Sequence, residues 1–326
     1  MFESFPNLWT PVLPLTLIDR NPMPAEIAGE KLVIFKDTSD EWHVLLDKCP
    51  HRGAALSLGD ITPEGEIRCA YHGWRYKGDG SCARVPMNDI SDKALAKIHA
   101  TALPTRLIGG CVWIYTSTKV MNKEEVVSLP GPLLPKTMQG NPEAYACYPQ
   151  EWQAHWTRAF ENFIDFTHPP YLHQASIGGW MHDFAEGGAV SRITHEETDY
   201  GYNMTTALGE SRRGFPVEWY QPNMTVLHFG DTPYKTLHVF CVPVNATHTR
   251  VMNVRMVPTA DDVQAQLERC LITDKQVLDE DRAIVESQHG CVLSNPAEIS
   301  VAGDSPSLIF RKWYKNLHDF NGGATS

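Results

Sequence analysis

The chain has 326 residues, of which 42% are hydrophobic and 21% charged, a composition typical of a globular protein with room for two domains. Its net charge of -11 argues against nucleic-acid binding, which needs clustered lysine and arginine. No apolar run is long enough to span a membrane, and the N-terminal segment lacks the pattern of a secretory signal. Eight cysteines in such a chain are expected to be reduced thiols, which predicts a cytoplasmic protein.

The first third of the chain is predicted to be β-rich. Runs at 31–35 and 42–46 are joined by a short polar segment, which indicates a hairpin. Proline, glycine and charged residues then dominate 121–149, with little periodicity. The sequence therefore predicts a first domain at 1–120, a linker at 121–149 and a second domain at 150–326.

Two segments of the first domain each contain one cysteine and one histidine. Cys49 and His51 lie in CPHRG, and Cys69 and His72 lie in CAYHGW. Two thiolates and two imidazoles suit a tetrahedral zinc site, as in a zinc-stabilised binding module, or a two-iron, two-sulfide cluster with two histidines on one iron. Both pairs lie in glycine-containing segments between predicted strands, where backbone N–H groups can approach sulfur, and this favours the cluster.

A second group of candidate ligands lies in the second domain. Residues 151–168 are predicted to form a helix ended by a Pro-Pro pair, because residues before proline avoid the α region. Asn162, Asp165 and His168 are three residues apart, which places them on one helical face. His173 follows the Pro-Pro turn, which can bring it back towards His168. Two imidazoles and a carboxylate form the facial triad of non-haem Fe(II) oxygenases; the alternative is one capping and one surface histidine.

The carboxylate is predicted to come from the longest expected helix, 260–288. Four apolar residues surround Asp281 at helical spacing: Val277, Leu278, Ile284 and Val285. A charge on this buried stripe needs a partner, and a metal is one. Asp279 has polar neighbours, and Glu280 lies at the border of the stripe. Asp281 is therefore the predicted ligand, with a buried salt bridge to an arginine such as Arg158 as the alternative.

The two cysteine–histidine segments resemble, nearly residue for residue, the cluster-binding loops of Rieske non-haem iron oxygenases. With the ligand pattern of the second domain, the chain is similar over both domains to the α-subunit of these ring-hydroxylating enzymes. The resemblance implies an α+β fold, with an N-terminal all-β Rieske domain and a catalytic domain whose curved antiparallel sheet is covered by helices. It assigns Cys49 and Cys69 to one iron of a [2Fe–2S] cluster, and His51 and His72 to the other.

The same resemblance implies that His168, His173 and Asp281 bind a mononuclear Fe(II). It also implies a homotrimer in which Asp165 bridges the histidine ligands of the two centres across the subunit interface. Asn162, three residues before Asp165, is the other candidate catalytic residue.

The function implied is a terminal oxygenase that activates O2 and hydroxylates or oxidatively demethylates a small apolar or aromatic substrate. The sequence has neither a dinucleotide-binding fingerprint nor a plant-type ferredoxin motif, so electrons must come from a separate NAD(P)H-dependent reductase or ferredoxin. Ala54 and Tyr71 replace the disulfide-forming cysteines of respiratory Rieske proteins, so a low cluster potential is expected. The alternative is a Rieske electron carrier or redox sensor without oxygenase activity.

Overall fold

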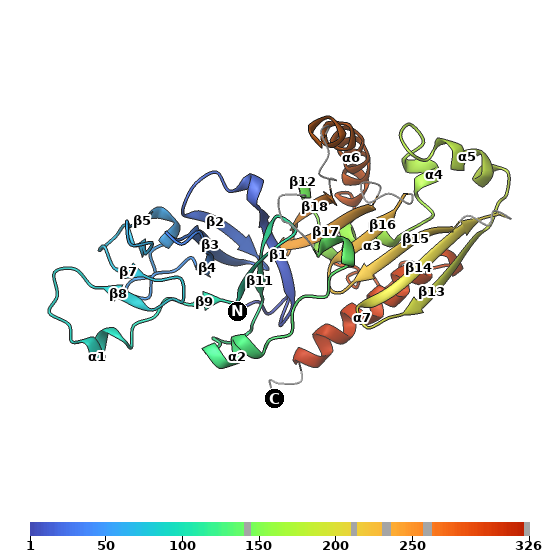
Figure 1. Cartoon of the computed structure of the whole chain (residues 1–326). Coiled ribbons are helices and arrows are strands. Elements are labelled where there is room, and N and C mark those ends of the chain that lie inside the picture. The colour runs from blue at the N-terminus through green and yellow to red at the C-terminus, as the bar shows by residue number, and fades with distance from the viewer. Residues whose placement is uncertain (140–144, 210–213, 230–235, 257–262, 323–326) are drawn as a thin grey trace. The chain divides into compact units, whose positions relative to one another are not determined.

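The computed structural model describes residues 1–139, 145–209, 214–229, 236–256 and 263–322 (Figure 1). The chain divides into two compact units, Met1–Pro132 and Leu133–Ser326. Within the described ranges, no helix combines the length and the apolar character needed to cross a membrane.

The segment predicted to be a linker, 121–149, has structure of its own. Helix α2 (Lys123–Ser128) begins with a capping box, in which Asn122 and Glu125 bind each other's backbone N–H groups. Strand β12 (Tyr145–Trp152) begins before the segment ends. The unit boundary falls after Pro132. The predicted limits, 1–120 and 150–326, stay a prediction.

The first unit contains three small antiparallel sheets. Their strands are, sheet by sheet, β1 (Trp9–Pro14), β11 (Cys111–Tyr115) and β10 (Thr105–Ile108); β2 (Met23–Ile27), β3 (Glu30–Lys36), β4 (Trp42–Leu46) and β9 (Ala102–Leu103); β5 (Asp60–Ile61), β6 (Ile67–Arg68), β7 (Arg75–Tyr76) and β8 (Cys82–Arg84). A single short helix, α1 (Asp92–Leu95), precedes β9. The predicted hairpin is confirmed, because β3 pairs with β4 and places Val33 opposite Leu45 in the core.

The second unit is built on a seven-stranded antiparallel sheet in the order β12-β18-β17-β16-β15-β14-β13. Its further strands are β13 (Ser191–Glu197), β14 (Gly201–Leu208), β15 (Gly214–Tyr220), β16 (Met224–His228), β17 (Thr236–Asn245) and β18 (His248–Met256). Its helices are α3 (Trp156–Ile164), α4 (Pro169–Leu172), α5 (Gly179–Glu186), α6 (Val263–Val285) and α7 (Ser305–Gly322). The expected all-β first domain and sheet-and-helix second domain are thus confirmed.

The core of the second unit lies between this sheet and α3 and α7. Trp219 of β15 is fully buried against Phe160 of α3 and Phe310 of α7, with ring centroids 5.6 and 5.5 Å away. Large aromatic side chains of this kind contribute much of the apolar area that folding removes from water. The same face of the sheet carries Val217 and Leu227, which are paired across β15 and β16.

The helix predicted at 151–168 is wrong at both ends. Residues 151–152 belong to β12, and α3 ends at Ile164, where Asp165 has extended backbone angles. His168 is instead the residue before α4, whose first two residues are the Pro-Pro pair. Proline is favoured at the start of a helix because the N–H it lacks has no intrahelical acceptor there. The pair therefore opens a helix rather than ending one.

Helix α6, within the predicted 260–288, confirms the long C-terminal helix. Leu278, Asp281 and Val285 are each at most 1% exposed, as the apolar stripe predicted. Ile284, also assigned to the stripe, is 48% exposed, so its assignment was wrong. The stripe is narrower than the sequence indicated.

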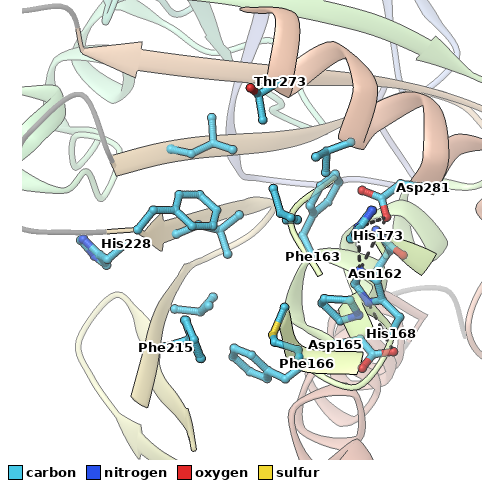
Figure 2. A pocket seen from close by; sticks show the side chains of 18 of the residues that line it. Asn162, Phe163, Asp165, Phe166, His168, His173, Phe215, His228, Thr273 and Asp281 are labelled. Atoms are coloured by element: carbon cyan, nitrogen blue, oxygen red, sulfur yellow. Dashed lines mark hydrogen bonds and ion pairs between the residues drawn. The ribbon is translucent and has the colours of Figure 1, made fainter. Parts of the chain in front are cut away.

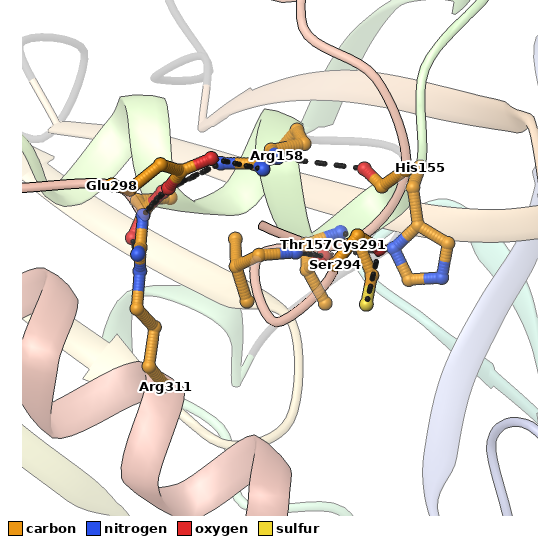
Figure 3. A network of polar contacts seen from close by, with 10 residues as sticks. His155, Thr157, Arg158, Cys291, Ser294, Glu298 and Arg311 are labelled. Carbon is orange, nitrogen blue, oxygen red and sulfur yellow. Dashed lines mark hydrogen bonds and ion pairs between the residues drawn. The ribbon is translucent and has the colours of Figure 1, made fainter. Parts of the chain in front are cut away.

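Arg158 of α3 belongs to a network of four charged side chains (Figure 3). It donates to both carboxylate oxygens of Glu298, at 3.2 and 2.6 Å. Arg311 of α7 donates to both oxygens of Glu161, at 2.6 and 2.8 Å, and also contacts Glu298. The network ties α3, α7 and the segment after α6 together without net charge. Arg158, the alternative partner considered for Asp281, is thus engaged by other carboxylates.

Replacing the buried Arg158 with alanine should lower the stability of the second unit by about 3 kcal/mol, because its partly buried carboxylate partners lose a cation. Urea unfolding followed by tryptophan fluorescence would measure this. The matched control is Arg282→Ala, which breaks an exposed pair with Glu286 and should cost less than about 0.5 kcal/mol. Equal losses in the two variants would contradict a structural role for the network.

Candidate functional site: two metal centres and a cavity

The two cysteine–histidine loops of the first unit have the same backbone design. In each, the cysteine N–H donates to the carbonyl five residues later, Cys49 to Ala54 and Cys69 to Trp74. The glycine four residues after each cysteine donates back to the cysteine carbonyl, and both glycines have positive φ, 75° and 70°. Only glycine adopts this conformation at little cost, which explains the CPHRG and CAYHG patterns.

These loops direct sulfur inwards and imidazole outwards. Cys49 and Cys69 are each 2% exposed and lie in the core cluster of the unit, whereas His51 is partly exposed and His72 exposed. The imidazole rings of His51 and His72 lie 4.6 Å apart, and Trp74 stacks on His51 at 4.4 Å. Nδ1 of His51 is buried and has no hydrogen-bond partner. Burial raises the pKa of the Cys69 thiol, so a bound cation is needed to hold it as thiolate.

Tyr76 contributes a contact that the sequence did not reveal. Its hydroxyl lies 3.2 Å from Cys49 Sγ, and the side chain is fully buried. Burial and the neighbouring Cys49 raise the pKa of Tyr76, so the hydroxyl keeps its proton and can donate it to sulfur. The sequence could have indicated this contact, because side chains alternate along a strand and Tyr76 is the inward-facing residue of β7.

In the second unit, the structure brings the three predicted ligands together (Figure 2). Nε2 of His168 and Nε2 of His173 are 3.2 Å apart. Asp281 Oδ1 lies 3.6 Å from the first nitrogen and 3.1 Å from the second. His168 precedes and His173 follows the single turn of α4, while Asp281 projects from α6.

This donor set fits a mononuclear metal. Two ligands about 2.1 Å from one ion and about 90° apart lie about 3.0 Å from each other, close to the observed spacings. Asp281 is 1% exposed, and its Oδ1 accepts no hydrogen bond. A buried carboxylate oxygen without a donor is costly unless a cation binds it. Two imidazoles, one carboxylate and no sulfur match the preference of non-haem iron.

Glu280, which the sequence placed at the border of the stripe, orients one of the imidazoles. Its Oε2 accepts from His173 Nδ1 and from Ser176 Oγ, both at 2.7 Å, and its Oε1 accepts from Gln276 at 3.1 Å. Holding the proton at Nδ1 leaves the lone pair of Nε2 facing Asp281. Burial alone would lower the pKa of His173, but Asp281 and Glu280 outweigh it and raise this pKa. A cation must therefore compete with a proton for Nε2.

Asp165 and Asn162 lie beside His168 although no continuous helix joins them. Asp165 Oδ2 is 3.8 Å from His168 Nδ1, and Oδ1 accepts from the backbone N–H and hydroxyl of Thr167 at 2.6 and 2.8 Å. Burial raises the pKa of Asp165, but His168 and Thr167 outweigh it and lower the pKa. The carboxyl is therefore ionised. Nδ2 of Asn162, in the last turn of α3, is buried without a partner.

One cavity of about 830 Å³ is bordered by all five residues predicted for the second site: Asn162, Asp165, His168, His173 and Asp281. The triad occupies one end, while Phe215 and His228 lie towards the other (Figure 2). Apolar side chains from the sheet and the helices form most of its walls, among them Phe163, Phe166, Val217, Leu227 and Leu278. A cavity of this size and character can enclose a small organic molecule beside the metal centre.

Two cysteine–histidine loops in a mainly β unit, followed by a histidine–carboxylate triad at a cavity, are the features expected of a protein of Rieske-type iron chemistry. Comparison with family models agrees: residues 9–98 match the Rieske [2Fe–2S] domain, and 152–319 match the vanillate O-demethylase oxygenase C-terminal domain. The second match covers more than half of the chain. The chain belongs to the Rieske oxygenases with this catalytic domain, a family with a [2Fe–2S] cluster and a mononuclear iron.

Individual relatives carry the names of oxygenases and demethylases. Chloroplastic chlorophyllide a oxygenase of Chlamydomonas reinhardtii is 26% identical over 97% of this chain, which spans 49% of that protein. Methylxanthine N3-demethylase of Pseudomonas putida is 27% identical over 95% of this chain and 89% of its own length. The chain therefore spans about half of some relatives and most of others.

Solved structures confirm the fold. A variant of the Pseudomonas putida demethylase NdmA with theobromine superimposes with a TM-score of 0.74 at 23% identity, over 97% of this chain and 92% of that one. Dicamba monooxygenase superimposes with a TM-score of 0.71 at 16% identity, over 97% and 98%.

Replacing Tyr76 with phenylalanine should lower the midpoint potential of the cluster by about 40 to 60 mV, because a hydrogen bond of about 1 to 1.4 kcal/mol to Cys49 sulfur favours the reduced state. Spectroelectrochemistry would measure the shift, with the visible spectrum retained. Tyr71→Phe is the control, since Tyr71 is 65% exposed and its ring packs at a tilt against His72, with centroids 3.8 Å apart. An unchanged potential in Tyr76→Phe would refute the sulfur contact.

Replacing Glu280 with alanine should weaken Fe(II) binding in the second unit by about 10- to 100-fold, because His173 loses the acceptor that fixes its tautomer. Competition with a chromophoric chelator would measure the affinity, and the cluster spectrum should not change. Asp279→Ala is the matched control, since Asp279 is exposed and binds Gln150. If both variants keep full affinity, Glu280 does not position the ligand.

Proposed function

We propose that this chain is the terminal oxygenase component of a multi-protein system. It would use O2 to hydroxylate or oxidatively demethylate a small apolar or aromatic molecule. The observation that carries the proposal is the convergence of His168, His173 and Asp281 at the wall of an apolar cavity. An electron carrier or redox sensor, the alternative, needs neither feature.

The geometry of the two loops and of the triad supports the residues proposed to hold the cofactors. Cys49 and Cys69 would bind one iron of the cluster and His51 and His72 the other, while the triad would bind Fe(II). When bound, these groups supply stored electrons and an Fe(II) with open positions for dioxygen.

The protein's own side chains prepare that chemistry. Glu280 accepts the proton of His173 Nδ1 and so leaves Nε2 as the ligand atom that faces Asp281, and Asp281 supplies a buried negative charge. The apolar walls of the cavity exclude water and hold the substrate beside the metal centre, which increases the effective concentration of the reacting groups. Asn162, whose amide nitrogen is buried at the triad, is placed to donate a hydrogen bond to a bound oxygen atom.

Asp165 is the proposed link between subunits. Its carboxylate lies near Nδ1 of His168, the nitrogen that faces away from the triad and has no hydrogen-bond partner. In a homotrimer, Asp165 would bridge His168 to the exposed His72 of a second copy. The partly exposed side chain of Asp165, at 34%, is compatible with such a contact.

The remaining partners are proposed from the relatives. A carbazole 1,9a-dioxygenase oxygenase with the same fold has been solved in complex with ferredoxin, which supports a separate ferredoxin or reductase as electron donor. The vanillate O-demethylase type of the second domain and the methylxanthine demethylase relatives favour oxidative demethylation of a ring-bearing substrate. Eight free cysteines favour a reducing, cytoplasmic setting.

Replacing His168 with alanine should abolish oxygenation, because the triad loses one of three ligands, and should leave the cluster spectrum intact because the two centres share no residue. Turnover of a substrate found by screening and visible absorption would be measured together. Retained turnover would sink the assignment of the second centre.

Metal analysis separates the two candidate functions. After anaerobic purification and resupply of Fe(II), the oxygenase should hold about three irons and about two acid-labile sulfides per chain, and His168→Ala about two of each. If the unchanged chain binds only two irons, the electron-carrier alternative replaces the oxygenase.

A further inference from the structure

The cavity concentrates polar atoms that lack partners. Among the described residues, eight buried side-chain nitrogen or oxygen atoms have no hydrogen-bond partner, and five of them belong to residues that line this cavity: Asn162, His168, Thr206, Asn253 and Asp281. Buried polar groups in native proteins are nearly always paired. The unpaired atoms of Asn162, His168 and Asp281 lie at the triad and are explained by the functions proposed for it. The unpaired atoms of Thr206 and Asn253 are not explained in this way.

Asn253 lines the same cavity as the triad and belongs to strand β18. Its side chain is 3% exposed, and it faces the cavity from β18 together with Arg255, two residues further along the strand. Arg255 is bound to Asp274 of α6. Asp274 precedes Asp281 by seven residues, which places both on one face of α6, two turns apart. Asn253, opposite this face, therefore lies between the Arg255–Asp274 pair and the metal centre.

The ion pair beside Asn253 leaves no net charge at this wall. Arg255 donates to both oxygens of Asp274, at 2.7 and 2.5 Å, and their side chains are 12% and 4% exposed. The charge of Arg255 is already neutralised, and Arg269, the other arginine that lines the cavity, is exposed to solvent, so a carboxylate placed here would lie against Asp274 without a buried cation beside it. The wall therefore suits an uncharged ligand.

The rest of the cavity wall is mostly apolar and partly aromatic, with Phe163, Phe166, Leu227 and Leu278 among its residues. Such surfaces suit a flat hydrocarbon body. An unpaired amide oxygen in an otherwise apolar wall, in turn, favours a ligand that brings a hydrogen-bond donor to that point, since a ligand without one leaves the oxygen desolvated and unpaired.

We propose that Asn253 Oδ1 accepts a hydrogen bond from the substrate. The substrate is then an uncharged ring compound with an N–H or O–H donor on one edge, held so that another part of the ring faces the metal centre. This inference rests on the proposed function, because the bound ring compound is a substrate only if the chain is an oxygenase. The binding it describes is measurable without turnover.

The test compares two ring compounds of nearly equal shape, indole, which has an N–H donor, and benzofuran, which has none. Under anaerobic conditions the holoenzyme should bind indole about fivefold more tightly, the effect of one net hydrogen bond of about 1 kcal/mol. Isothermal titration calorimetry would give both affinities. In Asn253→Leu, which keeps the number and branching of the side-chain heavy atoms but removes the acceptor, the ratio should fall to about one.

Thr206→Val is the matched control. Thr206 Oγ1 is the other unpartnered atom, but β14 is four strands from β18, about 19 Å along a flat sheet, so a two-ring ligand held at Asn253 does not reach it. This variant should keep the preference for indole. Indole-3-carboxylate should bind more weakly than indole, because Asp274 repels it.

Equal binding of indole and benzofuran by the unchanged holoenzyme would overturn the proposal, and this comparison needs no variant to fold. A preference that persists in Asn253→Leu would also overturn it, as would tighter binding of the carboxylate. The proposed function is tested separately by the iron content and the His168→Ala variant. Failure of this recognition site with an intact iron count therefore leaves the oxygenase assignment standing.

Discussion

A buried carboxylate without a protein cation is the constraint on which the second unit depends. Asp281 is almost fully enclosed on the apolar stripe of α6, next to two imidazoles and with one oxygen unpaired. Glu280, the next residue along the helix, binds the far side of one of those imidazoles. Two carboxylates on one imidazole are stable only if a cation balances them. The apolar packing of α6 and the placement of α4 thus have a shared purpose, which is to present an incomplete coordination sphere.

The first unit solves a related problem by different means. Its ligands come from two similar short loops, closed by backbone hydrogen bonds and glycines with positive φ, and so need no long helix to place them. Sulfur lies in the core near Tyr76, and imidazole reaches the surface beside Trp74. Because of this arrangement, hydrogen bonds to the buried sulfur atoms can adjust the redox potential, while the imidazole side stays open to an electron-transfer partner.

The sequence predicted what depends on local spacing. The loops around Cys49 and Cys69 are self-contained, so their ligand pattern was visible directly, and the helical period of α6 distinguished Asp281 from Asp279. Features that depend on distant contacts were missed. The histidine that Glu280 binds is more than 100 residues away in the sequence. The end of helix α3 before Asp165 was missed because a proline pair can either end or begin a helix. The cavity, and the unpaired amide oxygen of Asn253 in its wall, arise only when residues from six strands and four helices meet.

The two histidines of the triad lie at the ends of a four-residue helix, whereas the carboxylate comes from a chain segment more than 100 residues later. A metal ion held by both segments acts as a cross-link that closes a very long loop, and such links stabilise a fold by restricting the unfolded chain. Iron bound at the triad would thereby couple iron supply to resistance to proteolysis. In an iron-starved cell the region around α4 and α5 would loosen first, so that idle copies of the enzyme are the ones most readily degraded.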